Sequence, residues 1–217
     1  MKKLVKGIVE FRKNLRPAYQ EVFAKLALGQ KPDALFISCS DSRVAPDVFA
    51  STDPGDLFVV RNVGNMIPRS GDDGHSASDE SEAAAIEFAL ENLDVVNVIV
   101  CGHSQCGAMQ ALANGRDKVT LPHLRSWLRH GEESLARLSA ADSHDPNLLS
   151  KQNVLQQLDN LRSYPIIRQR LAEGRIKLHG WWFELTTSSV YVFDEEYQDF
   201  VLIDEKEAQR ILKKIEK

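Results

Sequence analysis

The stretch ALFISCSDSR at residues 34–43 joins a short apolar run to a cluster of polar and chemically reactive side chains. Its apolar part, residues 34–37, is too short for a typical helix and is followed at once by serine and cysteine, which favours a buried strand. A second stretch, VVNVIVCGHSQCG at residues 95–107, repeats this arrangement with a run that only Asn97 interrupts. Each stretch therefore predicts a buried strand that ends in a polar loop.

Further elements around these two stretches predict an α/β fold. A third apolar run, residues 57–60, follows a turn signal, and residues 82–93 have the pattern of a helix between the second and third strands. Because continuous apolar strands are buried on both faces, we predict a mostly parallel central β-sheet flanked by helices. Later in the chain we predict helices at 121–138 and 148–161 and strands at 176–186, 190–193 and 200–203.

The first thirty residues have helical spacing of their own. Val5, Ile8, Phe11 and Leu15 fall on one stripe, and a second helix restarts at Pro17. We therefore predict an extended N-terminal helical arm over residues 1–29. No internal repeat or linker divides the chain, so we expect one domain over residues 1–217.

The charge and composition of the chain limit the kinds of partner that we expect it to bind. The 217 residues are 43% hydrophobic and 27% charged, and 27 basic residues are spread among 31 acidic ones. This balance shows no electrostatic footprint for nucleic acid or for an anionic membrane, so we expect neither partner. No apolar run approaches the roughly 18 residues that a membrane span needs. Three cysteines are too few for a disulfide framework, and we expect a cytoplasmic protein.

The polar ends of two predicted strands carry a set of metal ligands. Cys39 follows the strand expected at residues 34–37, and His103 and Cys106 follow the strand expected at residues 95–100. His103 and Cys106 are three residues apart at an expected helix start, so we expect both side chains to project from the same helical face. The carboxyl ends of adjacent parallel strands meet at one edge of the sheet, so these side chains can converge. Two thiolates and an imidazole are ligands that zinc prefers, and three protein ligands leave a fourth position open. We therefore predict a Zn²⁺ site at this edge, with Cys101 a core residue.

Asp41 and Arg43 lie directly beside the first ligand. Zn²⁺ with two thiolates and a neutral imidazole has no net charge, so it is a weaker Lewis acid than zinc held by three histidines. Arg43 can hold the Asp41 carboxylate through a bidentate pair. The carboxylate then either accepts a hydrogen bond from zinc-bound water or becomes the fourth ligand, and these alternatives give an active and a blocked site.

The residues just described resemble the β-class carbonic anhydrases, in their plant-like and bacterial branch. The resemblance rests on residues 39–44 and 103–108, which are similar to the two zinc motifs of that family, and it extends over residues 55–62, 84–87 and 178–181. It implies a zinc enzyme, a carbonate dehydratase, that reversibly hydrates carbon dioxide to bicarbonate and a proton through zinc-bound hydroxide. It also implies a homodimer or a dimer of dimers in which the N-terminal helices reach over the partner.

The resemblance assigns further roles. It implies zinc ligation by Cys39, His103 and Cys106, a catalytic pair of Asp41 and Arg43, and substrate binding by Gln30, Phe58 and Phe88. Phe88 stands where many plant-like members have tyrosine, so a hydroxyl is missing there.

One subgroup of the family holds an inhibitory bicarbonate with tryptophan, arginine and tyrosine. The matching positions here are Phe36, Arg61 and Phe183. Two of the three differ, so we predict that this regulatory pocket is absent.

Two alternatives to carbon dioxide hydration stay open at the level of sequence. The same zinc site and fold would suit a hydrolase acting on a related linear molecule, carbon disulfide or carbonyl sulfide, because sequence does not reveal pocket shape. A non-catalytic zinc-binding or thiol-redox module is the second alternative. Asp41 and Arg43 argue against it, since a structural zinc site needs neither.

Overall fold

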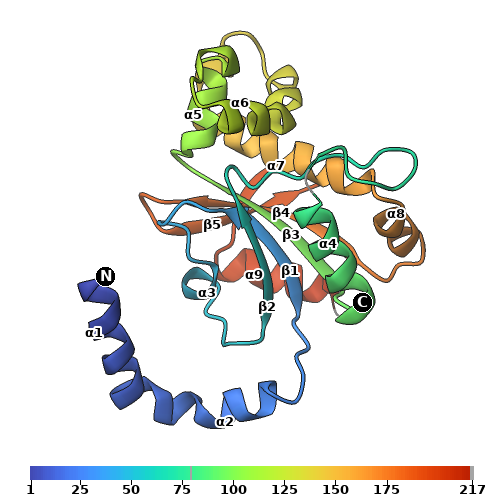
Figure 1. The fold of residues 1–217 in the computed structure, drawn as a ribbon. Coiled ribbons are helices and arrows are strands. Elements are labelled where there is room, and N and C mark those ends of the chain that lie inside the picture. The colour runs from blue at the N-terminus through green and yellow to red at the C-terminus, as the bar shows by residue number, and fades with distance from the viewer. Residues whose placement is uncertain (79, 216–217) are drawn as a thin grey trace.

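A sheet whose strands run mainly parallel forms the centre of the protein (Figure 1). The computed structural model describes residues 1–78 and 80–215, and within them six strands lie in the order β2-β1-β3-β4-β5-β6. Strands β2, β1, β3 and β4 pair in parallel, and β5 and β6 add antiparallel pairs at one side. The predicted fold class is therefore confirmed. The strands are β1 (Ala34–Cys39), β2 (Leu57–Asn62), β3 (Asn97–His103), β4 (Lys177–Glu184), β5 (Ser189–Asp194) and β6 (Asp199–Leu202).

Helices surround this sheet and precede it. The α-helices are α1 (Lys2–Glu10), α2 (Arg16–Leu26), α3 (Pro46–Phe49), α4 (Ser81–Glu87), α5 (Gly107–Ala113), α6 (Pro122–Trp127), α7 (Pro146–Arg162), α8 (Pro165–Ala172) and α9 (Glu205–Ile215). Two π-helical turns, η1 (Phe11–Leu15) and η2 (Phe88–Asn92), and three 3₁₀ segments, η3 (Arg116–Lys118), η4 (Leu128–Arg137) and η5 (Asp142–His144), complete the described part of the chain. None of the helices described is both long enough and apolar enough to cross a membrane.

Both faces of β1 and β3 are buried, as their apolar runs predict, whereas the edge strand β2 is only partly buried. Along β1, Leu35 and Ile37 point into one apolar cluster, and Ala34 and Phe36 point into another on the opposite face. The period of two along a strand produces this division. Helix α7 packs against β3 and β4. The sheet is therefore enclosed between two apolar layers, and its strand ends are the parts left for polar chemistry.

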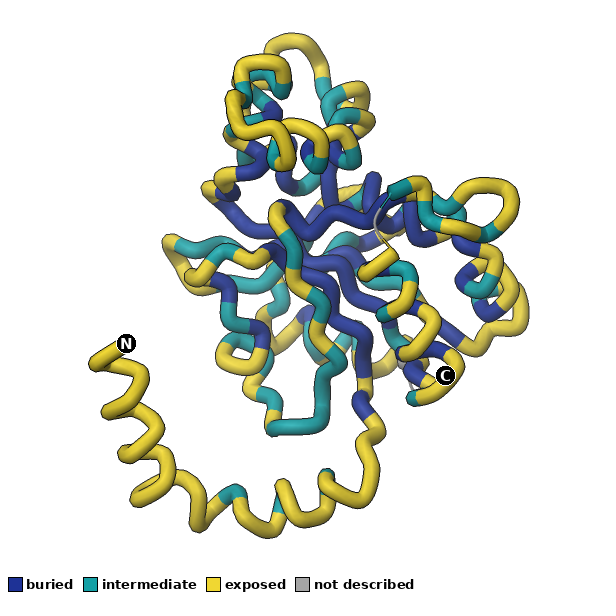
Figure 2. Tube along the Cα trace, in the orientation of Figure 1, coloured by how far each residue is buried: buried dark blue, intermediate teal, exposed yellow. Residues whose placement is uncertain are grey.

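The N-terminal arm extends away from this core. Helices α1 and α2, joined by η1, contain no buried residue, and they leave the body of the protein as an exposed curve (Figures 1 and 2). Pro17 lies in the first turn of α2, as predicted, where its missing N–H leaves no partner unpaired. The apolar stripe of α1 faces solvent, with Leu4 64% and Ile8 67% exposed. The predicted helical arm is confirmed.

A third apolar cluster covers the carboxyl ends of β1 and β3. Helix α5 and segment η4 contribute Met109, Leu112 and Leu128 to it, and the cluster also contains Cys39 and Cys106. The edge of the sheet where the predicted zinc ligands lie is therefore shielded by its own small core.

We predict that Gly102→Ala destabilises the fold by about 1–3 kcal/mol, because overpacking a filled core has a cost of this order. Gly102 lies where α7 crosses β3, and an added Cβ would lie 2.7 Å from Cγ2 of Val154. The free energy of unfolding is measured by urea titration. Adding Val154→Ala should recover part of the loss, so that the double variant loses less than the sum of the two single variants. Simple additivity would contradict the packing argument.

Candidate metal centre

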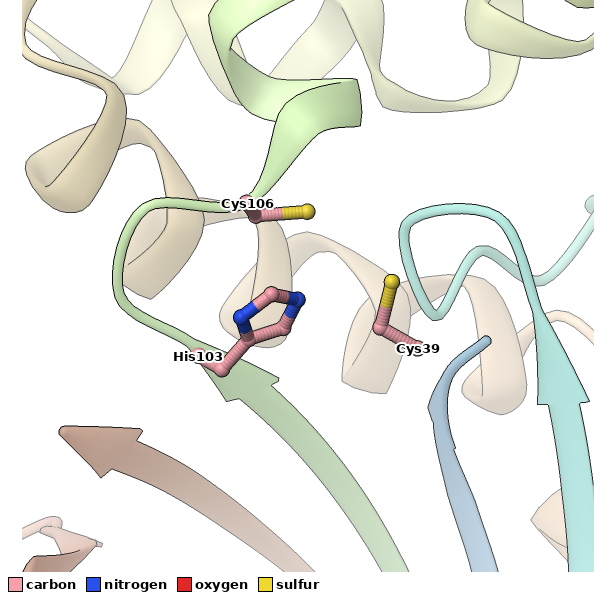
Figure 3. A group of neighbouring side chains, drawn as sticks. All are labelled: Cys39, His103 and Cys106. Atoms are coloured by element: carbon pink, nitrogen blue, oxygen red, sulfur yellow. The ribbon is translucent and has the colours of Figure 1, made fainter. Parts of the chain in front are cut away.

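The pairing of β1 with β3 brings three ligand residues to one point. In the parallel register Ser38 lies opposite Cys101, so Cys39 and His103 both end their strands at the same edge of the sheet. Cys106 follows within three residues and precedes the first turn of α5. Figure 3 shows the three side chains directed toward one another, and their ligand atoms all lie within 4.8 Å of each other.

The turn between His103 and Cys106 differs from the sequence-based expectation. His103 belongs to β3, and α5 begins only at Gly107, so the expectation that both ligands project from one helical face is wrong. Gln105 has a φ of 54°, in the left-handed region, and its N–H donates to Oδ1 of Asn147 at 2.7 Å. A tight turn, not helical spacing, therefore brings Cys106 back over His103.

Hydrogen bonding fixes the state of the His103 ring. Its Nδ1 lies 2.9 Å from the carbonyl oxygen of Ser104, which can only accept, so Nδ1 carries the proton. The buried Nε2 has no hydrogen-bond partner among the described residues and presents its lone pair. Burying such an acceptor without a partner is costly. This orphaned nitrogen beside two sulfurs is the observation that fits a bound metal ion.

The two sulfurs interact directly. The neighbouring Cys106 thiol, together with the N–H of Gly64, stabilises the ionised Cys39 sulfur and lowers the pKa of Cys39 below its ordinary value. The same contact with Cys39, together with burial, raises the pKa of Cys106. One sulfur is thus stabilised as a thiolate. Two cysteines and one histidine, all buried, form a donor set suited to zinc, which could replace the shared proton.

Cys101, the remaining cysteine of the chain, does not join this group. It lies fully buried in the apolar cluster on one face of the sheet, and burial raises the pKa of its thiol. The structure thus places it in the core.

Asp41 and Arg43 form a clamp beside the ligands. Nε and Nη2 of Arg43 donate to the two carboxylate oxygens of Asp41 at 2.9 and 2.7 Å, and the Arg43 N–H adds a bond of 3.0 Å. These bonds hold the pKa of the Asp41 carboxyl well below its usual range. Oδ2 of Asp41 lies 4.0 Å from Nε2 of His103. An ionised acceptor therefore faces the metal centre.

Arg61 holds the loop that carries this clamp. Its guanidinium donates to the carbonyl oxygens of Cys39, Asp41 and Val44 at distances between 2.8 and 3.1 Å. Three carbonyls of one short loop are therefore tied to a single side chain of β2. Sequence reasoning considered Arg61 only as a position matching a regulatory pocket that it predicted to be absent. Its place in the strand next to β1 is the signal that could have indicated the role seen here.

The structure does not bring Gln30 to the metal centre of its own chain. Gln30 lines a cavity of about 620 Å³ with Phe23, Leu26 and Gly55. It precedes β1, whereas Cys39 ends that strand, and six residues of strand span roughly 17 Å.

Phe58 and Phe88 also lie away from the centre. Their rings stack with centroids 5.7 Å apart. Phe58 is opposite Leu35 in the register of β1 and β2, and four positions, or about 13 Å of strand, separate it from Asn62, the residue opposite Cys39. All three expected substrate-binding residues are thus at a distance from the ligands of the same chain.

Sequence reasoning missed a group of buried polar residues on α7 that supports the centre. Ser150, Asn153, Gln157 and Asn160 are at most 2% exposed, although the helix packs into the apolar core. Their spacing of three and four residues places these polar side chains along one side of the helix, and this is the signal that could have drawn attention to them.

Comparison with known proteins agrees with this geometry. Residues 34–190 match a family model described as carbonic anhydrase. The chain is 37% identical to a carbonic anhydrase of Pseudomonas aeruginosa, with 94% of this chain and 93% of the relative covered. It is 38% identical to carbonic anhydrase 1 of Escherichia coli O157:H7, with 93% and 91% covered.

Solved structures give the same assignment. The β-carbonic anhydrase CcaA superposes with a TM-score of 0.83 at 38% identity, over 93% of this chain and 98% of that one. CafA, a β-carbonic anhydrase of Aspergillus fumigatus, gives a TM-score of 0.74 at 28% identity, over 89% and 90%. The resemblance expected from the two motifs is confirmed: the chain belongs to the carbonic anhydrase family, in its β class.

Proposed function

We propose that this protein is a zinc-dependent carbonic anhydrase that reversibly hydrates carbon dioxide to bicarbonate and a proton. The observation that carries the proposal is the convergence of Cys39, His103 and Cys106 beside an ionised carboxylate. Zinc bound by these residues would lower the pKa of a coordinated water toward about 7 and so supply hydroxide to attack carbon dioxide. Family membership supports the reaction, and we expect it to take place in the cytoplasm.

Asp41 and Arg43 direct this chemistry from one side. Arg43 donates to both carboxylate oxygens, which keeps Asp41 ionised and fixed in orientation. A carboxylate so held supports the role of hydrogen-bond acceptor for the attacking water rather than that of fourth ligand. Asp41 thereby orients the nucleophile and compensates for the neutral charge of zinc with two thiolates.

A second copy of the chain supplies the substrate-binding residues in this proposal. Gln30, Phe58 and Phe88 are too far from the ligands of their own chain to touch a substrate there. Phe88 is 44% exposed and Val59 on the edge strand β2 is 39% exposed, which supports an apolar contact face. A homodimer, alone or doubled, would place this face and the N-terminal arm against the partner.

The regulatory bicarbonate pocket of some relatives is absent in this proposal. Phe183 stacks on Phe49 with centroids 4.5 Å apart, and Phe36 contacts Phe49 and Trp181. The guanidinium of Arg61 already donates its hydrogen bonds to backbone carbonyls of the loop that begins at Cys39. These contacts support a filled aromatic core in which no polar pocket is left for an anion.

Cys106→Ser should abolish stoichiometric zinc binding and lower the stability of the fold, since metal binding and folding are coupled. Zinc content is measured by atomic emission on purified protein, together with the rate of carbon dioxide hydration. Cys101→Ala is the matched control, because this buried thiol lies outside the ligand group, and it should retain zinc and activity. A Cys106→Ser protein with one zinc per chain would refute the ligand assignment. Faster turnover of carbon disulfide or carbonyl sulfide by the wild type would favour the related hydrolase instead.

Asp41→Asn should keep zinc bound but reduce the hydration rate by about tenfold to a hundredfold, a range typical for partners of metal-bound groups. The amide cannot serve as the ionised acceptor that the Arg43 clamp maintains. Stopped-flow hydration assays at matched zinc content measure the effect. Asp47→Asn in α3, where the carboxylate is outside the centre, should leave the rate unchanged. Full activity of Asp41→Asn would remove the clamp from the mechanism.

Ile8→Asp should weaken assembly, because it puts a charge on the apolar stripe of the arm that the proposed dimer covers. Light scattering should show a wild-type mass that is an even multiple of 24.4 kDa and a shift of the variant toward the monomer. Lys6→Glu on another side of α1 changes charge without touching the stripe and serves as the control. A wild-type monomer with full activity would contradict the dimer.

A further inference from the structure

The peptide group between Val63 and Gly64 touches the metal centre from outside the two ligand motifs. The N–H of Gly64 donates to Sγ of Cys39 at 3.4 Å. At the other end of the same peptide group, the carbonyl oxygen of Val63 accepts a hydrogen bond of 2.7 Å from Nε1 of Trp127 in α6. A donor on the carbonyl polarises the amide and strengthens its N–H as a donor. The indole is therefore coupled to the sulfur through one peptide plane.

The next peptide group is fixed from the opposite side. Nδ2 of Asn153 donates to the carbonyl oxygen of Gly64 at 3.0 Å, and both residues are buried. Gly64 has a φ of 83°, and a Cβ there would lie 2.9 Å from Cβ of Ala108, so the backbone has little freedom to move away. Trp127 and Asn153 thus hold the two peptide groups that flank the Cα of Gly64.

The rest of this loop depends on α7 in a different way. Asn160 also donates to a loop carbonyl, that of Ile67, at 2.8 Å, and Gln157 accepts from the Ile67 N–H at 2.7 Å. A buried loop has no water to satisfy its backbone, so these carboxamides replace it. Ile67 lies three residues beyond Gly64, and among the described residues Asn160 forms no hydrogen bond with a sulfur. Asn160 therefore supports the loop but does not contact the sulfur of Cys39.

We propose that Trp127 and Asn153 are positioning residues that hold the Gly64 N–H against the Cys39 sulfur and thereby tune its bond to the metal. A hydrogen bond draws electron density from a thiolate, so the sulfur donates less to the ion and leaves it a stronger Lewis acid. This matters in a site where two thiolates already cancel the charge of a divalent metal. The inference rests on the proposed metal centre, and it concerns residues that neither ligate nor touch the substrate.

The test uses the full-length protein loaded with Co²⁺, whose thiolate-to-metal absorption band reports how strongly sulfur donates. Trp127→Phe removes the indole donor, and Asn153→Asp removes the amide donor while it keeps the side-chain shape. Both should move the band to longer wavelength at one cobalt per chain, because a sulfur without the hydrogen bond gives up electron density more easily. The controls are Trp181→Phe, an indole in the aromatic cluster on a face of the sheet, and Asn160→Asp.

Urea titration separates positioning from stability. We expect Asn153→Asp and Asn160→Asp to lose similar stability, but only the former to shift the band. If Asn153→Asp does not fold, Trp127→Phe still tests the inference, because the Trp127 side chain is partly exposed and its replacement should disturb the fold less. An unshifted band in Trp127→Phe, or equal shifts in variant and control, would overturn this inference alone. A wild-type chain that binds cobalt without any thiolate band would overturn the proposed metal centre, and this inference with it.

Discussion

The parallel pairing of β1 with β3 is the constraint on which the metal centre depends. The ligands come from motifs more than sixty residues apart, and only the register that sets Ser38 against Cys101 makes both strands end at one point. Burial of both strand faces fixes that register, since a slip by one residue would exchange the two apolar faces. The hydrophobic core and the chemistry therefore share one cause: the fold that buries β1 also delivers Cys39 to His103.

Polar groups around a buried centre need hydrogen-bond partners within the protein. Nδ1 of His103 donates to the Ser104 carbonyl, and the guanidinium of Arg61 donates to the carbonyls of the loop that begins at Cys39. From α7, Ser150 donates to the His103 carbonyl at 2.8 Å and Asn153 to that of Gly64. Such a network leaves few alternative positions for the ligands. Preorganisation of this kind reduces the rearrangement that metal binding and catalysis would otherwise require.

Local patterns predicted most of the elements, because burial imposes a period that the sequence records. Strands 34–37 and 57–60 were predicted within a few residues of β1 and β2. Residues 121–138 were predicted as one helix, yet the chain changes to 3₁₀ form from Leu128. There Gly131 lies so close to Leu112 and Met66 that a Cβ would meet them at 2.7 and 2.8 Å. The change from α-helix to 3₁₀ helix thus occurs where tertiary packing is close, and the helix propensity of the sequence does not reveal such packing.

The sequence by itself determined the chemistry of the donor set, the mostly parallel sheet and the N-terminal helical arm, since residue type and apolar period are local properties. Only the tertiary structure decided how the ligands meet, because Cys106 reaches His103 through the left-handed turn at Gln105 and not through helical spacing. It also separated Gln30 from Cys39, since a six-residue strand sets its two ends far apart. Hydrogen bonds between residues 89 positions apart, as from Asn153 to Gly64, depend on three-dimensional placement that no local pattern encodes.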